Sequence, residues 1–534
     1  MKILAALTVA ALTWAGELAR WDAGSDSRGL ELVEGERAHY RWVRIGEQKM
    51  AAVVPVRDYF HRAAFLLRCR TAVRGPVWLT LEHPDTGYGL ISLTGEGIAV
   101  RDQFNVARLN TRRLRRAVFE LEGLAGGTEF RVEGLDRLRS AVLSDSPPPT
   151  ERPPLVEPTI RLERPVQLVT TAGADASRPE DLPRALASLR ELLPLARALG
   201  FNGIESYVKW DFVERSPGVF DWSFYDAVVA EIERHGLRWF PLLIVGSAYT
   251  LPDWFYRSPD NRGFVCLEHR MRNDIQTIFC GHQARYVRRF LEEFGKHYGH
   301  RGVLLGVRLG PSGNYGEAQY PARGELGWRG GPIHTHIGYW AGDPCARTHF
   351  QQWLRSRYKS IEELNRAWGE QFASFEQVEP FLPVTALARR KRLDFAHWYM
   401  DSMSEWCQQW AEWARAALPS AVIDQSSGGW GPVEIGTDYT HQARTMARLK
   451  GGIRLTNESD NYPQNFAITR MASSAARFYG AGLGYEPGGF GSARGVVARL
   501  FNMITNGGEH LFYYHSNLYG NDQAIEAWLR HAPM

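Results

Sequence analysis

Two glutamates, Glu317 and Glu486, each lie at or just past the end of a short apolar run that is typical of a β-strand, 303–309 and 482–486. The runs belong to a part of the chain in which strand patterns alternate with helical ones. In barrels built this way, the catalytic groups lie at the carboxyl ends of the strands. Hydrolysis of a glycosidic bond needs two carboxyl groups that face it. The pair therefore predicts a glycoside hydrolase.

The segment that follows the second predicted strand carries aromatic residues and an E-x-x-P-G-x-F-D pattern at 214–221. It resembles the segment at the same place in glycoside hydrolase families 35 and 42, the β-galactosidases, and in the β-amylases of family 14. The resemblance implies that Trp210 and Glu214 help to form one wall of a sugar site. For Glu214, capping or salt-bridging its own loop is an equally good interpretation.

A second segment, 350–369, is similar to the family 42 segment between the fourth and fifth barrel strands. The resemblance covers roughly 200–515 and implies the (β/α)8 fold of clan A, whose members retain anomeric configuration. It implies an acid/base glutamate after strand four, Glu317, and a nucleophile after strand seven, Glu486. The sequence 506–514, which follows Glu486 after a predicted helix, also resembles family 42 in outline.

The fourth strand departs from clan A, because Gly316 precedes Glu317 where those enzymes usually have Asn. The stretch 309–321 instead resembles the acid-bearing motif of β-amylases, lengthened by three residues. In both families the carboxylic acid role is kept, since the leaving oxygen needs a proton from a group with a raised pKa. Asn314 is a candidate replacement for the missing Asn as a sugar hydroxyl contact.

Glu458 offers an alternative base. Its segment, 453–463, resembles the β-amylase segment that carries the catalytic base, while Asp460 and Tyr462 fall in a pattern like the D-x-Y-P of family 42. If Glu458 were the base, water would attack directly and configuration would invert, with carboxyl groups about 6.5 to 9.5 Å apart rather than about 5 to 5.5 Å. We favour Glu486 as the nucleophile.

Several residues are candidates for substrate binding, and the aromatic ones among them are about equally suited to the core. They are Tyr207, Trp210, Glu214, Asn314, Trp430, Asp460, Tyr462 and Tyr514.

The periodicity predicts an α/β protein, a (β/α)8 TIM barrel preceded by a β-sandwich. We expect a signal peptide at 1–19, a sandwich at 20–143 that loosely resembles galactose-binding-like domains, a proline-rich linker at 144–158 and the catalytic barrel at 159–534. The expected barrel strands are 166–171, 203–209, 238–245, 303–309, 420–425, 452–457, 482–486 and 510–514.

Composition gives no reason to expect nucleic acid or a membrane as a partner. The chain has 534 residues, with 63 basic and 59 acidic residues and a formal charge of +4. The two signs are mixed along the chain, so no basic patch is expected to attract phosphate backbones or anionic lipids. No stretch beyond the amino terminus is apolar for the ~18 residues of a membrane span.

The five cysteines are few and odd in number, which does not fit a disulfide scaffold, so at most one or two bridges are expected. Cys266 and His269, followed by Cys280 and His282, have ligand types at roughly metal-binding spacing. The spacing matches no standard zinc pattern, and we favour ordinary cysteines and surface histidines, with no metal and no cofactor.

Together these features predict an exported, secreted or periplasmic, retaining glycosidase that acts on an oligo- or polysaccharide, with β-galactosides as the preferred substrate class. The alternatives are an inverting α-glucan hydrolase of the β-amylase type and a catalytically silent carbohydrate-binding barrel. Oligomeric state does not follow from the sequence.

Overall fold

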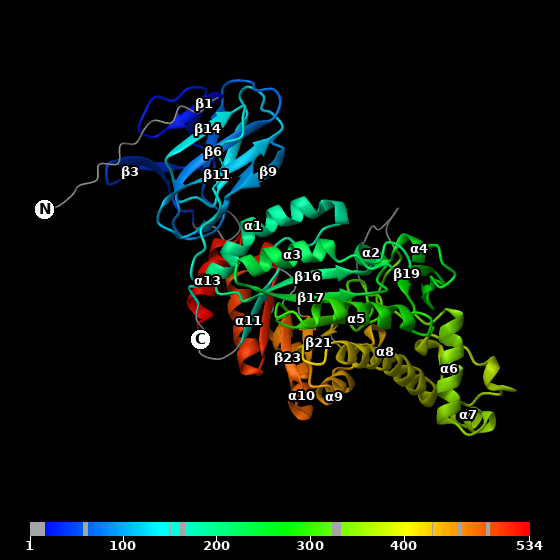
Figure 1. Ribbon diagram of the computed structural model, residues 1–534. Helices are drawn as coiled ribbons and strands as arrows, with labels where there is room; N and C mark the ends of the chain where they lie inside the picture. The colour runs from blue at the N-terminus through cyan, green and yellow to red at the C-terminus, as the bar shows by residue number, and fades with distance from the viewer. Residues whose placement is uncertain are drawn as a thin grey trace. The chain divides into compact units, whose positions relative to one another are not determined.

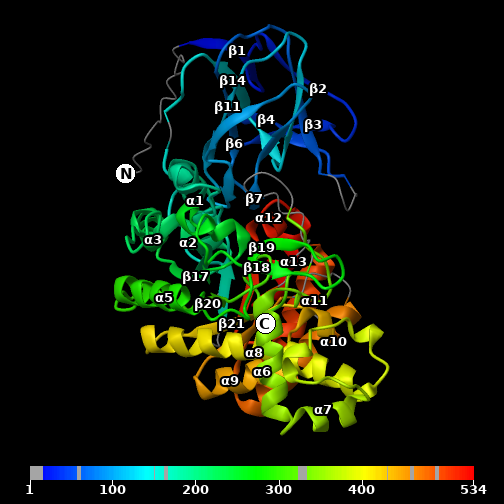
Figure 2. The same cartoon turned by 90° about the vertical axis from the view of Figure 1, so that its right-hand side faces the viewer.

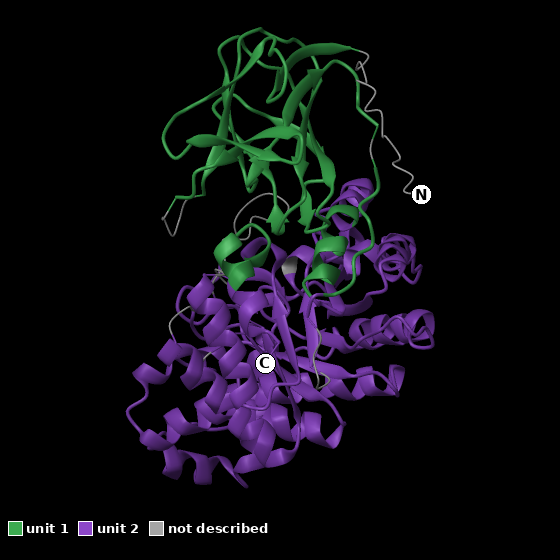
Figure 3. Cartoon of the chain, turned by 90° about the vertical axis from the view of Figure 1, so that its left-hand side faces the viewer, with its two compact units in different colours: residues 1–158, 190–199, 518–526 green, residues 159–189, 200–517, 527–534 purple. Residues whose placement is uncertain are grey.

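The protein forms two compact units in a computed structural model that describes residues 16–56, 62–149, 151–160, 166–322, 333–429, 431–456, 462–486 and 492–533. Figure 3 colours the two units. The first contains 1–158, 190–199 and 518–526; the second contains 159–189, 200–517 and 527–534.

The first unit is built from antiparallel sheets. Its main sheet has the order β1-β14-β6-β11-β9 and a second has the order β2-β5-β12-β8, with smaller sheets β13-β4-β3 and β10-β7. The strands are β1 Glu17–Asp22, β2 Leu30–Val33, β3 Tyr40–Ile45, β4 Gln48–Val53, β5 Ala64–Cys69, β6 Val77–Pro84, β7 Tyr88–Leu90, β8 Ser92–Thr94, β9 Val100–Phe104, β10 Ala107–Leu109, β11 Leu114–Leu121, β12 Glu129–Glu133, β13 Arg137–Leu138 and β14 Ser140–Ser144.

Alternate residues of the two larger sheets fill one hydrophobic core. Leu79 of β6 and Phe119 of β11 lie in the same buried cluster as Leu67 of β5 and Phe130 of β12. This period of two is what buries one face of each strand. The predicted domain boundaries and the likeness to galactose-binding domains stay predictions. β1 begins at Glu17, so the folded strand overlaps the end of the predicted signal peptide.

The second unit contains the predicted barrel. Its eight parallel strands close in the order β15-β16-β17-β20-β21-β22-β23-β24. They are β15 Gln167–Thr170, β16 Gly203–Lys209, β17 Arg238–Ile244, β20 Val307–Gly310, β21 Ile423–Ser427, β22 Gly452–Thr456, β23 Gly482–Glu486 and β24 His510–Tyr513. Figure 1 labels β16, β17, β21 and β23 of this barrel. The predicted TIM barrel is thereby confirmed.

Two strands lie a few residues later than the sequence predicts. β20 begins at Val307 instead of 303, and β21 begins at Ile423 instead of 420. Before β20 the backbone makes only an isolated bridge, Trp239 to Leu304. At Gly306 it passes so close to the Phe240 ring that an added Cβ would lie 2.5 Å from a ring carbon. An apolar run does not by itself mark where the ladder begins.

Helices connect the barrel strands, and Figure 2 shows many of them from a second side. They are α1 Leu182–Ala198, α2 Trp210–Val213, α3 Ser223–Arg234, α4 Asp253–Tyr256, α5 Ala284–Tyr298, α6 Pro344–Arg357, α7 Ile361–Trp368, α8 Arg389–Ala417, α9 Tyr439–Arg448, α10 Tyr462–Tyr479, α11 Ala493–Thr505, α12 His515–Leu518 and α13 Asp522–His531, with a short two-stranded sheet of β18 Gly263–Val265 and β19 Arg272–Gln276.

The long excursion between β20 and β21 contains α6, α7 and the 29-residue α8. Its helix ends are set by local sequence. Asp343 caps α6 by accepting a hydrogen bond from the Ala346 amide, and Ser360 caps α7 through the Glu363 amide. Gly369 ends α7 with a left-handed backbone, φ 73°.

Among the described residues, every helix is either too short or too polar to cross a bilayer.

Candidate active site

A group of four charged residues lies inside the barrel, each on a different strand. Glu205 is on β16, Arg308 on β20, Arg454 on β22 and Glu486 at the end of β23. All four side chains are at most 3 % exposed. Groups of this kind are buried only when they are paired, because an isolated charge in a low-dielectric interior is very costly. We call these four residues the charge lattice.

Each arginine of the charge lattice contacts both glutamates. Arg308 donates from Nη1 to Glu205 Oε1 at 3.1 Å, and its Nη2 lies 2.5 Å from Glu486 Oε2. Arg454 donates to the other oxygen of Glu205, and its Nε lies 3.5 Å from Glu486 Oε2. The two positive charges therefore face two carboxylates, and Glu486 is held against both arginines.

Tyr514 holds the other oxygen of Glu486, and Tyr207 in turn contacts Tyr514. The Tyr514 hydroxyl donates to Glu486 Oε1 at 3.2 Å, and the Tyr207 hydroxyl lies 2.9 Å from that of Tyr514. Because Tyr514 uses its proton toward Glu486, Tyr207 donates to Tyr514. Both tyrosines are only partly buried. The structure thus brings three predicted site residues together at one end of the barrel.

Glu317 lies in the tight loop that follows β20. The loop turns through two glycines with positive φ, Gly313 at 69° and Gly316 at 98°, a conformation that side chains other than glycine rarely adopt. The Ala318 amide donates to the Ser426 carbonyl of β21 at 2.7 Å. Glu317 also packs so closely on Gly428 that a Cβ there would lie 2.8 Å from Glu317 Cβ.

The Glu317 carboxyl has a pKa raised to about 7. Burial is the main cause, because it disfavours the charged form, and the nearby Glu486 charge raises the pKa further. Arg308 opposes both effects. Glu317 and Glu486 therefore act on each other and on the same guanidinium. Glu317 can carry a proton near neutral pH, while Glu486 lies against two arginines. Catalysis by an acid and a partner carboxylate requires this division of roles.

Trp210 and Glu214 lie elsewhere. Trp210 is completely buried, and its indole donates to Glu214 Oε2 at 2.6 Å. The other Glu214 oxygen accepts from the Gly218 amide at 2.7 Å and pairs with Arg289. Both side chains are thus engaged with each other, and Glu214 also with the Gly218 amide and Arg289 of α5. The structure favours the loop-closing interpretation over the sugar-wall interpretation, and we leave both residues out of the substrate site.

The remaining predicted residues divide into two groups. Asn314 is buried and accepts a hydrogen bond from the Ala322 amide at 3.3 Å, while Tyr462 is 48 % exposed at the start of α10 and stacks on Phe466. Three lie outside the described residues: Trp430, Glu458 and Asp460.

The motif comparison missed Glu205, Arg308 and Arg454, although the sequence carried a signal for them. Each is a charged residue inside a segment that is predicted to be a barrel strand, with apolar residues on at least one side of it. A strand buried on both faces accepts such a residue only with a partner. Tyr249 was also missed; it is 6 % exposed and its hydroxyl donates to the Tyr315 carbonyl at 3.4 Å.

A separate cluster could hold a metal ion. The sequence had grouped Cys266 and His269 with Cys280 and His282, but the structure places Cys266 and His269 with His334 and His336 instead. One ligand atom from each of these four lies within 4.8 Å of the others.

The distances fit a tetrahedral zinc site. Cys266 Sγ lies 3.4 Å from His334 Nε2 and 3.8 Å from His269 Nδ1, separations that suit ligands about 2.0 to 2.3 Å from a shared ion. His336 has its Nδ1 3.1 Å from the Ile337 carbonyl, and its buried Nε2 has no hydrogen-bond partner among the described residues. A bound ion would satisfy that nitrogen in a structural role.

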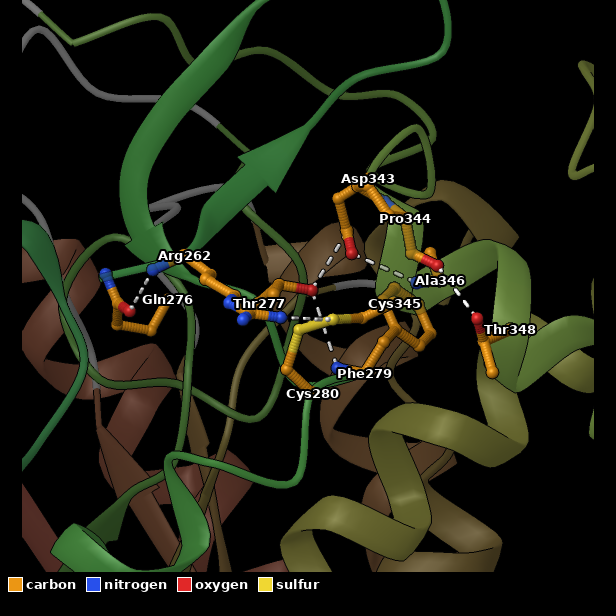
Figure 4. Close-up of a disulfide and its surroundings, with 10 residues drawn as sticks. All are labelled: Arg262, Gln276, Thr277, Phe279, Cys280, Asp343, Pro344, Cys345, Ala346 and Thr348. Carbon is orange, nitrogen blue, oxygen red and sulfur yellow. Dashed lines mark hydrogen bonds between the residues drawn. A yellow bond between two sulfur atoms is a disulfide. The ribbon is translucent and has the colours of Figure 1, made fainter. Parts of the chain in front are cut away.

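Cys280 is instead bonded to Cys345 in a disulfide that joins two segments 65 residues apart (Figure 4). The bridge ties the loop before α5 to the first turn of α6. Beside it, Thr277 donates to the Asp343 carboxylate at 3.0 Å, and Asp343 in turn caps α6 (Figure 4). The other cysteines, Cys69, Cys266 and Cys407, are free and buried.

Sequence comparison shows that the chain is similar to β-galactosidases and β-amylases. The family model described as β-galactosidase, glycoside hydrolase family 42, matches 332–449. A thermophilic β-amylase from Thermoanaerobacterium thermosulfurigenes is 24 % identical over 200 residues, which cover 34 % of this chain and 35 % of that protein. The β-galactosidase Bga from Halorubrum lacusprofundi is 24 % identical over 282 residues, 50 % of this chain and 35 % of that one.

Solved structures show the same fold. The catalytic domain of β-amylase from Paenibacillus polymyxa superposes with a TM-score of 0.54 at 16 % identity, covering 70 % of this chain and 99 % of that chain. A β-galactosidase from Bacillus circulans gives a TM-score of 0.51 at 15 % identity, covering 68 % and 55 %. The chain spans about a third of the length of the first curated relatives that it matches. The predicted resemblance to family 42, with β-amylase-like features, is confirmed.

The charge lattice yields a stability prediction. Replacing Glu205 with Gln leaves two buried guanidinium groups facing a single carboxylate, so the free energy of unfolding should fall by about 3–5 kcal/mol, measured by urea denaturation. Glu292→Gln is the matched control, because that glutamate pairs with Arg288 on the exposed surface of α5 and should cause little change. Equal effects of the two substitutions would contradict the lattice.

The Cys266 cluster yields a metal prediction. Purified protein should contain about one zinc ion per chain, and a chelator should lower Tm by at least the ~2–4 °C that corresponds to about 1 kcal/mol in a domain of this size. The Cys266→Ser variant should lose the metal and its response to the chelator. Metal-free protein with an unchanged melting curve would show that the four residues hold no ion.

Proposed function

We propose that this chain is a retaining glycoside hydrolase that cleaves β-galactosides or related β-glycosides by double displacement. The observation that carries the proposal is the placement of Glu486 in the charge lattice, with Glu317, whose pKa is raised to about 7, acting on the same Arg308. The family 42 match supports the substrate class. Two carboxyl groups with different environments at the carboxyl ends of barrel strands are what this chemistry needs.

In the first step Glu486 attacks the anomeric carbon while Glu317 gives its proton to the leaving oxygen. The glycosidic bond breaks as an ester bond forms between Glu486 and the sugar, and the aglycone leaves as an alcohol. In the second step Glu317, now a carboxylate, takes a proton from water as that water attacks the same carbon. The ester breaks, the sugar is released with its original configuration, and both glutamates return to their starting states.

The lattice determines which oxygen of Glu486 reacts. Oε2 is held by the two arginines, whereas Oε1 receives a single hydrogen bond from Tyr514. We assign the attack to Oε1, because it has less charge compensation and lies on the side of the partly exposed tyrosines. Tyr207 and Tyr514 are then positioned to contact the sugar ring, whose apolar face packs well on aromatic rings.

The inverting alternative is supported by a specific observation, the similarity to β-amylases in both sequence and fold. In that mechanism Glu317 keeps the acid role and Glu458 activates water. Glu458 lies outside the described residues, so the choice between Glu486 and Glu458 depends on the fate of the anomeric carbon.

We also propose that the protein is exported. The amino-terminal sequence supports this proposal, as does the Cys280–Cys345 disulfide, because disulfides persist mainly in oxidising compartments.

The stereochemistry of the first product separates the two mechanisms. Hydrolysis of an aryl β-galactoside, followed by proton NMR within the first minutes, should show the β-anomer of galactose before mutarotation. Initial appearance of the α-anomer from this substrate would contradict the role of Glu486.

The raised pKa of Glu317 predicts the alkaline limb of the pH profile. Only the protonated acid can give a proton to the leaving group, so kcat/KM should fall about tenfold per pH unit above about pH 7.

The Glu317→Gln variant should lose about 10²–10⁴-fold in activity on a galactoside with a poor leaving group, and its pH profile should no longer show this alkaline decrease. Glu293→Gln, which changes a partly exposed glutamate of α5 that pairs with Lys296, is the control. A protein that kept sugar binding but showed no hydrolysis before or after the substitution would instead be the silent carbohydrate binder.

A further inference from the structure

A cavity lies in the first unit, outside the barrel. Its volume is about 210 Å³, and four arginines line it, Arg113, Arg115, Arg116 and Arg152, with Glu151 as the acidic member of its lining. Arg115 and Arg116 lie at the beginning of β11, directly after Arg113. Arg152 and Glu151 come from the segment that follows β14.

Arg115 is built into the wall of this cavity. Its side chain is 9 % exposed, and its Nη1 donates to the Ala107 carbonyl at 2.7 Å and to Asp85 Oδ2 at 3.4 Å. Asp85 is itself fixed, since it accepts hydrogen bonds from the Leu109 and Thr111 amides at 2.9 and 3.1 Å. The guanidinium is therefore held in one orientation by the fold.

The second terminal nitrogen of Arg115 has no such anchor. Nη2 is buried without a hydrogen-bond partner among the described residues. A buried donor left unpaired is unfavourable, and the donor pattern of a guanidinium suits two oxygens of one planar or tetrahedral anion. The wall of the cavity therefore contains a fixed guanidinium, one terminal nitrogen of which lacks an acceptor in the part of the chain that the structure describes.

The charges around the cavity favour an anion over a neutral group. Asp85 and the buried Glu191 both compensate Arg115, and Glu82 lies 3.5 Å from Arg116. Arg113 and Arg152 remain, both exposed, against the single carboxylate of Glu151. The excess at the mouth is thus positive, on the side from which a ligand would enter.

The size of the cavity limits the ligand. It is smaller than the roughly 300–1,000 Å³ of pockets that enclose drug-sized molecules. Leu114 and two prolines, Pro149 and Pro154, add apolar surface beside the arginines. A single ring that carries a carboxylate or sulfate group fits such a combination of charge and apolar wall.

We propose that this cavity binds an acidic saccharide unit, through a carboxylate or sulfate ester held by Arg115, Arg113 and Arg152. The choice of a saccharide as the carrier rests on the proposed glycosidase function, whereas the choice of an oxyanion rests on the cavity alone. The site would hold an acidic part of a glycan apart from the residues that cleave it.

The test is direct binding to the full chain, measured by calorimetry with four probes: glucuronate, galactose 6-sulfate, neutral galactose and inorganic sulfate. We expect one of the two acidic sugars to bind at least about tenfold more tightly than galactose, and its affinity to fall with added salt. The two acidic sugars distinguish the carboxylate from the sulfate ester.

The variants locate the binding. Arg113→Ala with Arg152→Ala should weaken binding of the acidic sugar about tenfold or more, without loss of fold because both residues are exposed, and Arg115→Lys should weaken it as well. Arg101→Ala is the matched control, since Arg101 is an exposed arginine of the same unit that pairs with Glu122 and does not line the cavity. Hydrolysis of an aryl galactoside by the double variant should be unchanged.

Three results would overturn the proposal. Acidic and neutral sugars could bind equally or not at all, or the double variant could bind as the unmodified chain does. Inorganic sulfate as tight as galactose 6-sulfate would remove the saccharide from the proposal. Calorimetry measures binding without requiring hydrolysis. Failure of the proposed glycosidase activity and failure of the proposed anion binding can therefore be distinguished.

Discussion

The pairing of two arginines with two glutamates inside the barrel is the constraint on which the rest of the site depends. Arg308 and Arg454 cannot be buried without carboxylates, and Glu205 and Glu486 supply them from strands on different sides of the barrel. Glu205 uses both of its oxygens for the arginines. Glu486 uses one, and its other oxygen remains for Tyr514 and for chemistry.

The same constraint gives the two catalytic candidates different properties. Glu486 ends a strand and is held rigidly, whereas Glu317 lies in a loop shaped by Gly313 and Gly316 and closed against Gly428. Burial raises the pKa of Glu317, and the Glu486 charge adds to that effect. A glycosidase needs one carboxyl that holds a proton and one that stays charged, and here the difference arises from position in the barrel.

The architecture could be predicted well because its signals are local. Strand periodicity, the lengths of the intervening helices and the motifs at 214–221 and 350–369 each depend on neighbouring residues, and the barrel order follows from them. Strand starts were harder to predict, as at β20, where the apolar run begins at 303 but the strand begins at Val307.

The site was harder to predict because it depends on contacts between distant residues. Glu205 and Arg454 are 249 positions apart, and nothing in the sequence of either segment indicates that the two residues pair. The contacts of Trp210 and Glu214 include Arg289 in α5. The group of possible metal ligands brings Cys266 together with His334, which is 68 residues later in the chain. In each case the residue types gave the chemistry, but the partners came from the fold.

The central claim is that Glu486 forms a covalent bond to the sugar. It is tested most directly by incubation with a 2-deoxy-2-fluoro-β-galactoside that carries an activated leaving group, followed by mass spectrometry of the peptides. The account predicts one fluorosugar ester, located on Glu486, with a stoichiometry that approaches one per chain. An ester on Glu458, or inactivation without any labelled glutamate, would contradict it.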